Sequence, residues 1–152
     1  MEDIRWQFQQ IIRHFGLLDK NCCSAGGTEV SLVQSHILYE IDCQHEPSMQ
    51  EIAEILGIDI TTFSRQIQTL LQKNLVKKLP CSHDKRVSIL SLTEEGTKVV
   101  STIEKRVNEY LNEIFSHMNE FEKETVIRSL KLLNENMEKV WKRVCASSKE
   151  KL

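Results

Sequence analysis

Between Ser48 and Leu92, two short helix patterns are followed directly by two short strand patterns, an order that few folds accommodate. Ser48 and Glu51 have the spacing of a capping box at a helix start, and Gly57 is a typical left-handed helix stop. Asp59 is placed to cap a second helix, and one face of this helix is apolar. The apolar residues recur at helical spacing and are Phe63, Ile67, Leu70 and Leu71.

The opposite face of this second helix carries short hydroxyls, amides and one guanidinium. Its residues are Thr61, Ser64, Arg65, Gln68 and Gln72. These are the side-chain types that reach base edges and phosphates from a helix in a DNA major groove. The alternative interpretation is an ordinary solvated helix face.

The next two segments predict a β-hairpin. Val76 to Leu79 and Val87 to Leu92 are runs of strand length rich in β-branched residues, and they flank a loop that contains Asp84. From Ile60 to Leu92 the balance of charge is +5, although the whole chain has a net charge of −2. The six basic residues of this stretch are Arg65, Lys73, Lys77, Lys78, Lys85 and Arg86. Positive charge is therefore concentrated on a predicted winged helix-turn-helix, where a phosphate backbone would lie.

The flanking sequence is helical at both ends. Apolar stripes at helical spacing mark a first helix from Ile4, a helix capped by Thr93 with a stripe from Val100 to Met118, and a last helix from Val126. At about 1.5 Å of rise per residue, the long helices exceed what one small lobe can cover. A partner helix, most simply from a second copy of the chain, would cover them. The alternative is an internal helical bundle. The predicted fold is mainly α with a small β-hairpin: a winged helix-turn-helix region at 31–92, a helical dimerisation region at 1–30 and 93–146, and a flexible tail at 147–152.

Composition excludes several classes of protein. No apolar run approaches the length of about 18 residues that a membrane span needs, and Glu2 and Asp3 stand where a secretory leader would be basic. Five cysteines without a CxxC spacing in a chain with 40% hydrophobic residues predict thiols rather than disulfide staples. No Gly-rich phosphate loop, HExxH or nucleophile elbow occurs. We therefore expect a cytoplasmic protein that is not an enzyme and has no cofactor.

The segments "SMQEIAEILGIDITTFSRQIQTLLQKNLVKKL" and "CSHDKRVSILSLTEEG", with the long flanking helices, resemble the MarR family of bacterial transcriptional regulators. The resemblance implies a homodimer, most often a repressor, whose two winged lobes grip a palindromic operator.

By position, the resemblance assigns DNA contacts to the second helix of the pair and to the wing. Thr61, Thr62, Ser64, Arg65 and Gln68 would enter the major groove, with Lys73 and Lys85 as further DNA contacts. Arg86 would reach into the minor groove, and Asp84 would pair with it or with a neighbouring arginine to hold the wing tip in shape. A winged module that binds protein rather than DNA is the rival function, and the local charge of +5 disfavours it.

The regulatory input is open at this point. Cys22 and Cys23, expected in the connection between the first two helices, could react with an oxidant or bind a soft metal or metalloid, or they could be incidental. A zinc site would need His36 and further ligands that the sequence does not identify, so the metal is unknown. Relatives also respond to small aromatic ligands, for which Trp6, Phe8 and Phe15 could form a pocket. The remaining thiols, expected to be spare small residues, are Cys43, Cys81 and Cys145.

Overall fold

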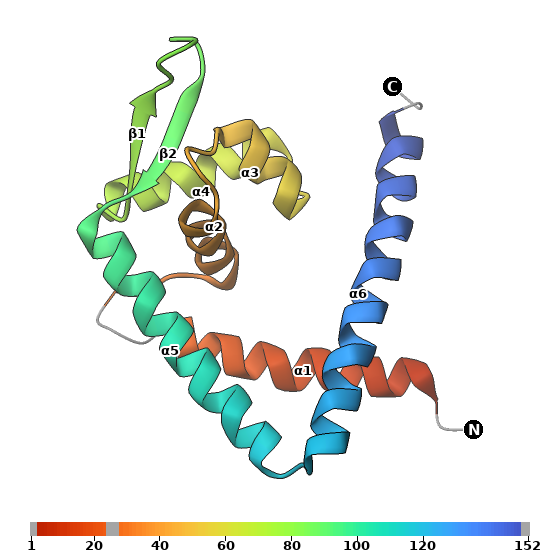
Figure 1. Ribbon diagram of the computed structural model, residues 1–152. Coiled ribbons are helices and arrows are strands. Elements are labelled where there is room, and N and C mark those ends of the chain that lie inside the picture. Colours follow the sequence, from red (N-terminus) through yellow and green to blue (C-terminus); the bar gives the residue numbers. More distant parts are fainter. Residues whose placement is uncertain (1–2, 24–27, 150–152) are drawn as a thin grey trace. The chain divides into compact units, whose positions relative to one another are not determined.

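The structure is a computed structural model that describes residues 3–23 and 28–149, with side chains at 3–16 and 28–144. Within these ranges the chain forms six helices and one two-stranded antiparallel sheet (Figure 1). The predicted fold class, mainly α with a small β-hairpin, is confirmed. The elements in chain order are α1 (Ile4–Cys23), α2 (Leu32–Cys43), α3 (Met49–Leu56), α4 (Ile60–Gln72), β1 (Val76–Pro80), β2 (Ser88–Leu92), α5 (Glu94–Ser116) and α6 (Glu120–Lys149).

Local hydrogen bonds set the ends of α3 and the start of α4. The Ser48 hydroxyl accepts from the Glu51 N–H at 3.1 Å, and the Glu51 carboxylate accepts from the Ser48 N–H at 2.7 Å. Gly57 ends α3 with a φ of 64°, and the Asp59 carboxylate accepts from the Thr62 N–H at 2.9 Å. The predicted capping box, left-handed stop and N-cap are therefore all present.

One hydrophobic core joins α2, α3, α4, the hairpin and the first turns of α5. Phe63, Ile67 and Leu70 supply the buried face of α4 and have no exposed side-chain surface. Burying one such side chain contributes about 1.5–3 kcal/mol, so the rotation of α4 that hides this face is strongly favoured. The rest of the core is Val30, Ile37, Leu38, Ile41, Ile52, Ala53, Leu75, Val76, Leu90, Val99 and Val100.

The hairpin pairs Val76 with Leu92 at its base and Pro80 with Ser88 at its far end. Near the loop, each strand differs from its prediction by one residue. β1 is one residue longer and includes Pro80, and β2 begins one residue later, at Ser88. The Leu90 N–H also donates to the Pro47 carbonyl at 2.9 Å. This bond attaches the hairpin to the connection between α2 and α3, while the loop at its tip extends away from the helices (Figure 1).

The chain divides into two compact units that meet between Asn108 and Glu109. This boundary lies inside α5, and Gly96, Val99 and Val100 in the first turns of α5 are buried in the winged core. α6 continues to Lys149, so residues 147–149 of the expected tail are helical, and 150–152 lie outside the described residues. Among the described helices, none is both long enough and apolar enough to span a membrane.

Candidate nucleic-acid interface

The face of α4 opposite the core is polar and exposed. Thr61, Thr62, Ser64, Arg65 and Gln68 all lie on this exposed surface. Hydrogen bonds from the side chain and backbone of Thr62 lower the pKa of Asp59, so the cap at the start of α4 is ionised at neutral pH. The helix therefore presents its polar residues on a backbone that is fixed from both the capped end and the buried face.

The tip of the hairpin, which we call the wing, is folded around Asp84. The Asp84 carboxylate accepts from the backbone N–H of Arg86 at 3.0 Å and from its Nε at 3.2 Å. The Asp84 carbonyl also accepts from the Val87 N–H at 3.0 Å. These bonds to Arg86 hold the pKa of Asp84 below its ordinary value, so the carboxylate keeps its charge at neutral pH.

Arg86 and Lys85 lie at the exposed end of this turn. The Arg86 side chain is 91% exposed although its Nε donates to Asp84. Asp84 therefore fixes the direction of the guanidinium without covering it. The sequence left open whether Asp84 pairs with Arg86 or with a neighbouring arginine, and in the structure Asp84 pairs with Arg86.

Lys73 lies at the end of α4, where the sequence predicts a DNA contact. Its ammonium donates a hydrogen bond to the backbone carbonyl of Glu29, just before α2. This side chain therefore has one partner within the chain, and two of its three N–H donors are left for other acceptors.

The side chains of Cys22 and Cys23 lie outside the described residues. Their backbone forms the last turn of α1, which ends at Cys23, and not the connection after it where the sequence predicted them. His36 is exposed on α2, and the described residues contain no cluster of three or more His, Cys, Asp or Glu side chains arranged to hold a metal ion. Cys43 and Cys81 are free thiols.

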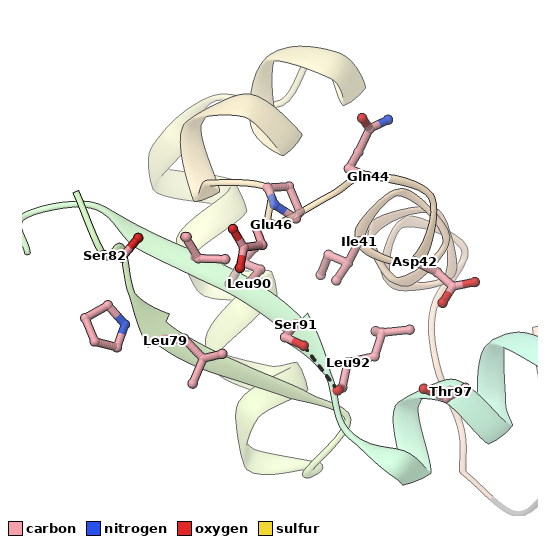
Figure 2. Close-up of a pocket in the computed structure, with 13 residues that line it drawn as sticks. Ile41, Asp42, Gln44, Glu46, Leu79, Ser82, Leu90, Ser91, Leu92 and Thr97 are labelled. Carbon is pink, nitrogen blue, oxygen red and sulfur yellow. Dashed lines mark hydrogen bonds between the residues drawn. The ribbon is translucent and has the colours of Figure 1, made fainter. Parts of the chain in front are cut away.

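A hollow of about 390 Å³ lies between the end of α2, the connection to α3 and the hairpin (Figure 2). Its lining includes the carboxylates of Asp42 and Glu46 and no basic side chain. Two carboxylates without a cation would repel phosphate, so this side of the hairpin is not a candidate DNA surface.

A second hollow, of about 290 Å³, is lined by residues of α1, α2 and α5. Phe15, His36, Tyr39 and Glu104 contribute to its lining, whereas Trp6 and Phe8 do not. The expected aromatic pocket thus receives only one of its three predicted residues. The pKa of Tyr39 is raised, mainly by a hydrogen bond with Cys43, so the phenol stays neutral at physiological pH.

Sequence reasoning missed one polar contact between α2 and α4. The Gln34 amide, buried at the start of α2, donates to the Gln66 side-chain carbonyl at 3.1 Å. Ser31 and Gln34 have the spacing of a capping box, and that signal could have identified Gln34 as structurally constrained. The partner on α4 could not have been found from spacing.

Six helices, a buried face on α4 and an ordered wing define a winged helix-turn-helix protein. Residues 30–88, which hold the winged helix-turn-helix, match the model of the MarR family. The chain is 28% identical over 145 residues to the uncharacterized HTH-type transcriptional regulator YybA of Bacillus subtilis, covering 91% of this chain and 96% of the relative. Together these matches bear out the resemblance to MarR-family transcriptional regulators, which are not enzymes.

Two solved structures illustrate the shared fold. Wild-type MarR from E. coli in its apo form has a TM-score of 0.73 at 21% identity, covering 88% of this chain and 97% of that one. FabT from Streptococcus pneumoniae, in complex with DNA, has a TM-score of 0.83 at 17% identity, covering 90% of this chain and 96% of FabT. At these identities the likeness establishes the fold.

Proposed function

We propose that this protein is a homodimeric repressor that binds a palindromic operator through α4 and the wing. The observation that carries the proposal is the exposed polar face of α4 beside a wing whose arginine is oriented by Asp84. The six basic side chains between Ile60 and Leu92 are all exposed, and Asp84, which is paired with Arg86, is the only acid of that stretch. The DNA complex of FabT, a protein of the same fold, supports this use of the surface.

The two parts of the surface would read DNA in different ways. Side chains at the start of α4 would contact base edges in the major groove: Thr61, Thr62, Ser64, Arg65 and Gln68. Lys85 would neutralise phosphate, and Arg86 would enter the minor groove, where a narrow groove concentrates negative potential. The sequence also predicts a DNA contact for Lys73, whose ammonium donates one of its three hydrogen bonds to the Glu29 carbonyl, and the salt dependence of binding by the Lys73→Ala protein tests that prediction.

The proposed dimer rests on apolar surface that a single chain leaves exposed. α6 exposes a stripe that includes Leu130, Leu133, Met137 and Val140, and α1 exposes Ile4, Ile11 and Ile12. Contiguous apolar faces of this extent on helices of 20 and 30 residues are typical of interfaces between protein chains. We propose that the terminal helices form the dimerisation region and that residues 31–92 form the DNA-reading region.

Alanine at Arg65 and alanine at Arg86 should reduce operator affinity in distinguishable ways. Loss of Arg65 should cost about 1–3 kcal/mol if the guanidinium makes a bidentate base contact, and it should relax discrimination among operator variants. Loss of Arg86 should weaken binding without changing the oligomeric state. Fluorescence anisotropy with labelled duplexes across a salt titration measures both effects.

The control for these two variants is Arg128→Ala, which removes an exposed arginine paired with Glu124 on α6. This variant should bind the operator as the parent does. Equal affinity of the parent and the Arg86 variant at every salt concentration would refute the wing assignment. Parent binding that does not weaken as salt rises would instead favour a protein-binding module.

We also propose that thiol chemistry at Cys22 and Cys23 releases the protein from DNA. Two adjacent thiols at the end of α1 are a chemically suitable target for peroxide, a trivalent arsenical or a thiophilic metal ion. Each of these reagents should release the reduced parent protein from its operator in a gel-shift titration. The Cys22→Ser/Cys23→Ser protein should bind equally well when reduced and should not respond.

Replacement of Cys43, an exposed thiol on α2, by serine is the matched control and should leave the response intact. An equal response of the parent and the double-serine protein would remove Cys22 and Cys23 from the mechanism. That result would favour the second candidate input, a small aromatic ligand in the hollow lined by Phe15 and Tyr39.

A further inference from the structure

Two side-chain contacts join α4 to the segment that begins α2. The Gln34 Nε2 donates to the Gln66 Oε1 at 3.1 Å, and the Lys73 ammonium donates to the Glu29 carbonyl. Both contacts reach residues 29–34, although Gln34 and Gln66 are separated by 32 positions in the sequence. Neither Gln66 nor Lys73 belongs to the buried apolar face of α4.

The spacing of the two contacts determines what they can control. Gln66 and Lys73 are seven residues apart, which is about two helical turns and roughly 10 Å along the axis. They therefore lie on the same side of α4, away from the face that carries Ser64 and Gln68. Two attachments on one side of a helix resist its rotation about its own axis as well as a tilt.

Gln34 is itself held in place before it reaches α4. Its Oε1 accepts from the Ser31 N–H at 3.1 Å, and the Ser31 hydroxyl accepts from the Gln34 N–H at 3.2 Å. With the amide oxygen directed at Ser31, the amide nitrogen is directed at Gln66. Since Gln34 is only 7% exposed, a buried donor would be left unsatisfied if Gln66 moved away.

We propose that Gln34 and Lys73 are positioning residues that set the rotation of α4 and, through it, the discrimination between operator and other DNA. The proposal rests on the proposed function, because it assumes that α4 reads bases. A rotation of about 15° moves side-chain tips by about 1.5 Å at the outer radius of a helix. This displacement exceeds the range of roughly 0.5 Å over which hydrogen-bond lengths vary, so base contacts are lost while contacts to diffuse phosphate charge persist.

The test compares operator and unrelated DNA. The operator is the duplex that the parent protein selects from a random-sequence pool, and affinities for it and for an unrelated duplex are measured at one salt concentration. Gln66→Ala removes the acceptor but leaves the Ser31 capping box intact. We expect a five- to tenfold fall in the ratio of operator to non-specific affinity, with unchanged non-specific binding. The melting temperature should also fall, because the buried Gln34 amide loses its acceptor, and the unchanged non-specific affinity shows that the winged region remains folded.

Further variants distinguish an effect on the position of α4 from an effect on folding or on charge. Gln66→Glu keeps an acceptor for Gln34 and should preserve the affinity ratio even if its charge lowers both affinities. Gln34→Ala and the double variant Gln34→Ala/Gln66→Ala should show the same fall in the affinity ratio as Gln66→Ala, because the two side chains act as one unit. Both of these variants also lose the capping bond from the Ser31 N–H to Gln34, so they should melt at a lower temperature than Gln66→Ala. Gln44→Ala, which loses an exposed side-chain hydrogen bond from the C-cap residue of α2 to Glu40, should retain the ratio.

Lys73→Ala tests the second contact, from the Lys73 ammonium to the Glu29 carbonyl, independently of the first. We expect the affinity ratio to fall while the salt dependence of binding keeps its slope. A slope reduced by about one would assign Lys73 to a phosphate instead. An unchanged ratio in Gln66→Ala would overturn the role of Gln34, whereas failure of the parent to select any duplex would overturn the proposed function itself.

Discussion

Replacing Leu130 and Met137 by glutamate is expected to convert the proposed homodimer into monomers and to lower operator affinity by about 100-fold or more. Both side chains lie on the exposed apolar stripe of α6, with Leu130 45% and Met137 55% exposed in the single chain. A glutamate buried at a helix–helix interface must lose its hydration or its charge, and two of them per chain would meet their equivalents across a two-fold axis. Each monomer would then hold only one half-site, and the gain from linked binding of two lobes would be lost.

Sedimentation equilibrium and operator titrations would measure the two effects on the same samples. Leu132→Glu is the matched control, because Leu132 is 62% exposed on α6 but faces away from the stripe that contains Leu130, Leu133 and Met137. This control should remain dimeric and bind normally. A double-glutamate protein that stays dimeric would place the interface elsewhere, and a monomer with parental affinity would show that one lobe suffices for binding.

Local sequence rules predicted the centre of the fold because its signals act over a few residues. The capping box of Ser48 and Glu51, the left-handed Gly57 and the cap at Asp59 each involve partners within four residues. The period of Phe63, Ile67 and Leu70 then fixed which face of α4 is buried. The rest of the helix surface had to be the exposed polar face. The candidate DNA-reading residues on α4 could therefore be named before any tertiary contact was known.

Other features depend on contacts that no local pattern encodes. The Gln34 to Gln66 bond and the Lys73 to Glu29 bond need the relative placement of two helices, which the core determines and the sequence spacing does not. The end of α1 was misplaced for a different reason. Its final residues, Lys20 to Cys23, carry no capping or stop signal, and the glycines that could end a helix come later, at Gly26 and Gly27.

The start of α5 contains a close contact that makes Gly96→Ala the most destabilising single methyl substitution that we can identify. A Cβ at Gly96 would lie 2.0 Å from the carbonyl oxygen of Leu75, a backbone atom that cannot rotate away. The same carbonyl accepts from the Thr93 N–H at 3.1 Å, and the Thr93 hydroxyl caps the helix by accepting from the Gly96 N–H at 3.0 Å. Relief of the clash must therefore move α5 from β1 and strain both bonds.

We expect Gly96→Ala to lower the free energy of unfolding by about 1–3 kcal/mol, the usual cost of overpacking a buried site. Thermal unfolding followed by circular dichroism would measure it as a fall in Tm of roughly 2–12 °C. Gly16→Ala is the matched control, since Gly16 is inside α1 and has nothing within 4 Å of the position of a Cβ. Alanine is the better helix former by about 1 kcal/mol, so this control should leave Tm unchanged or raise it. Equal Tm values for the two variants would mean that the first turn of α5 is not in close contact with the Leu75 carbonyl in solution.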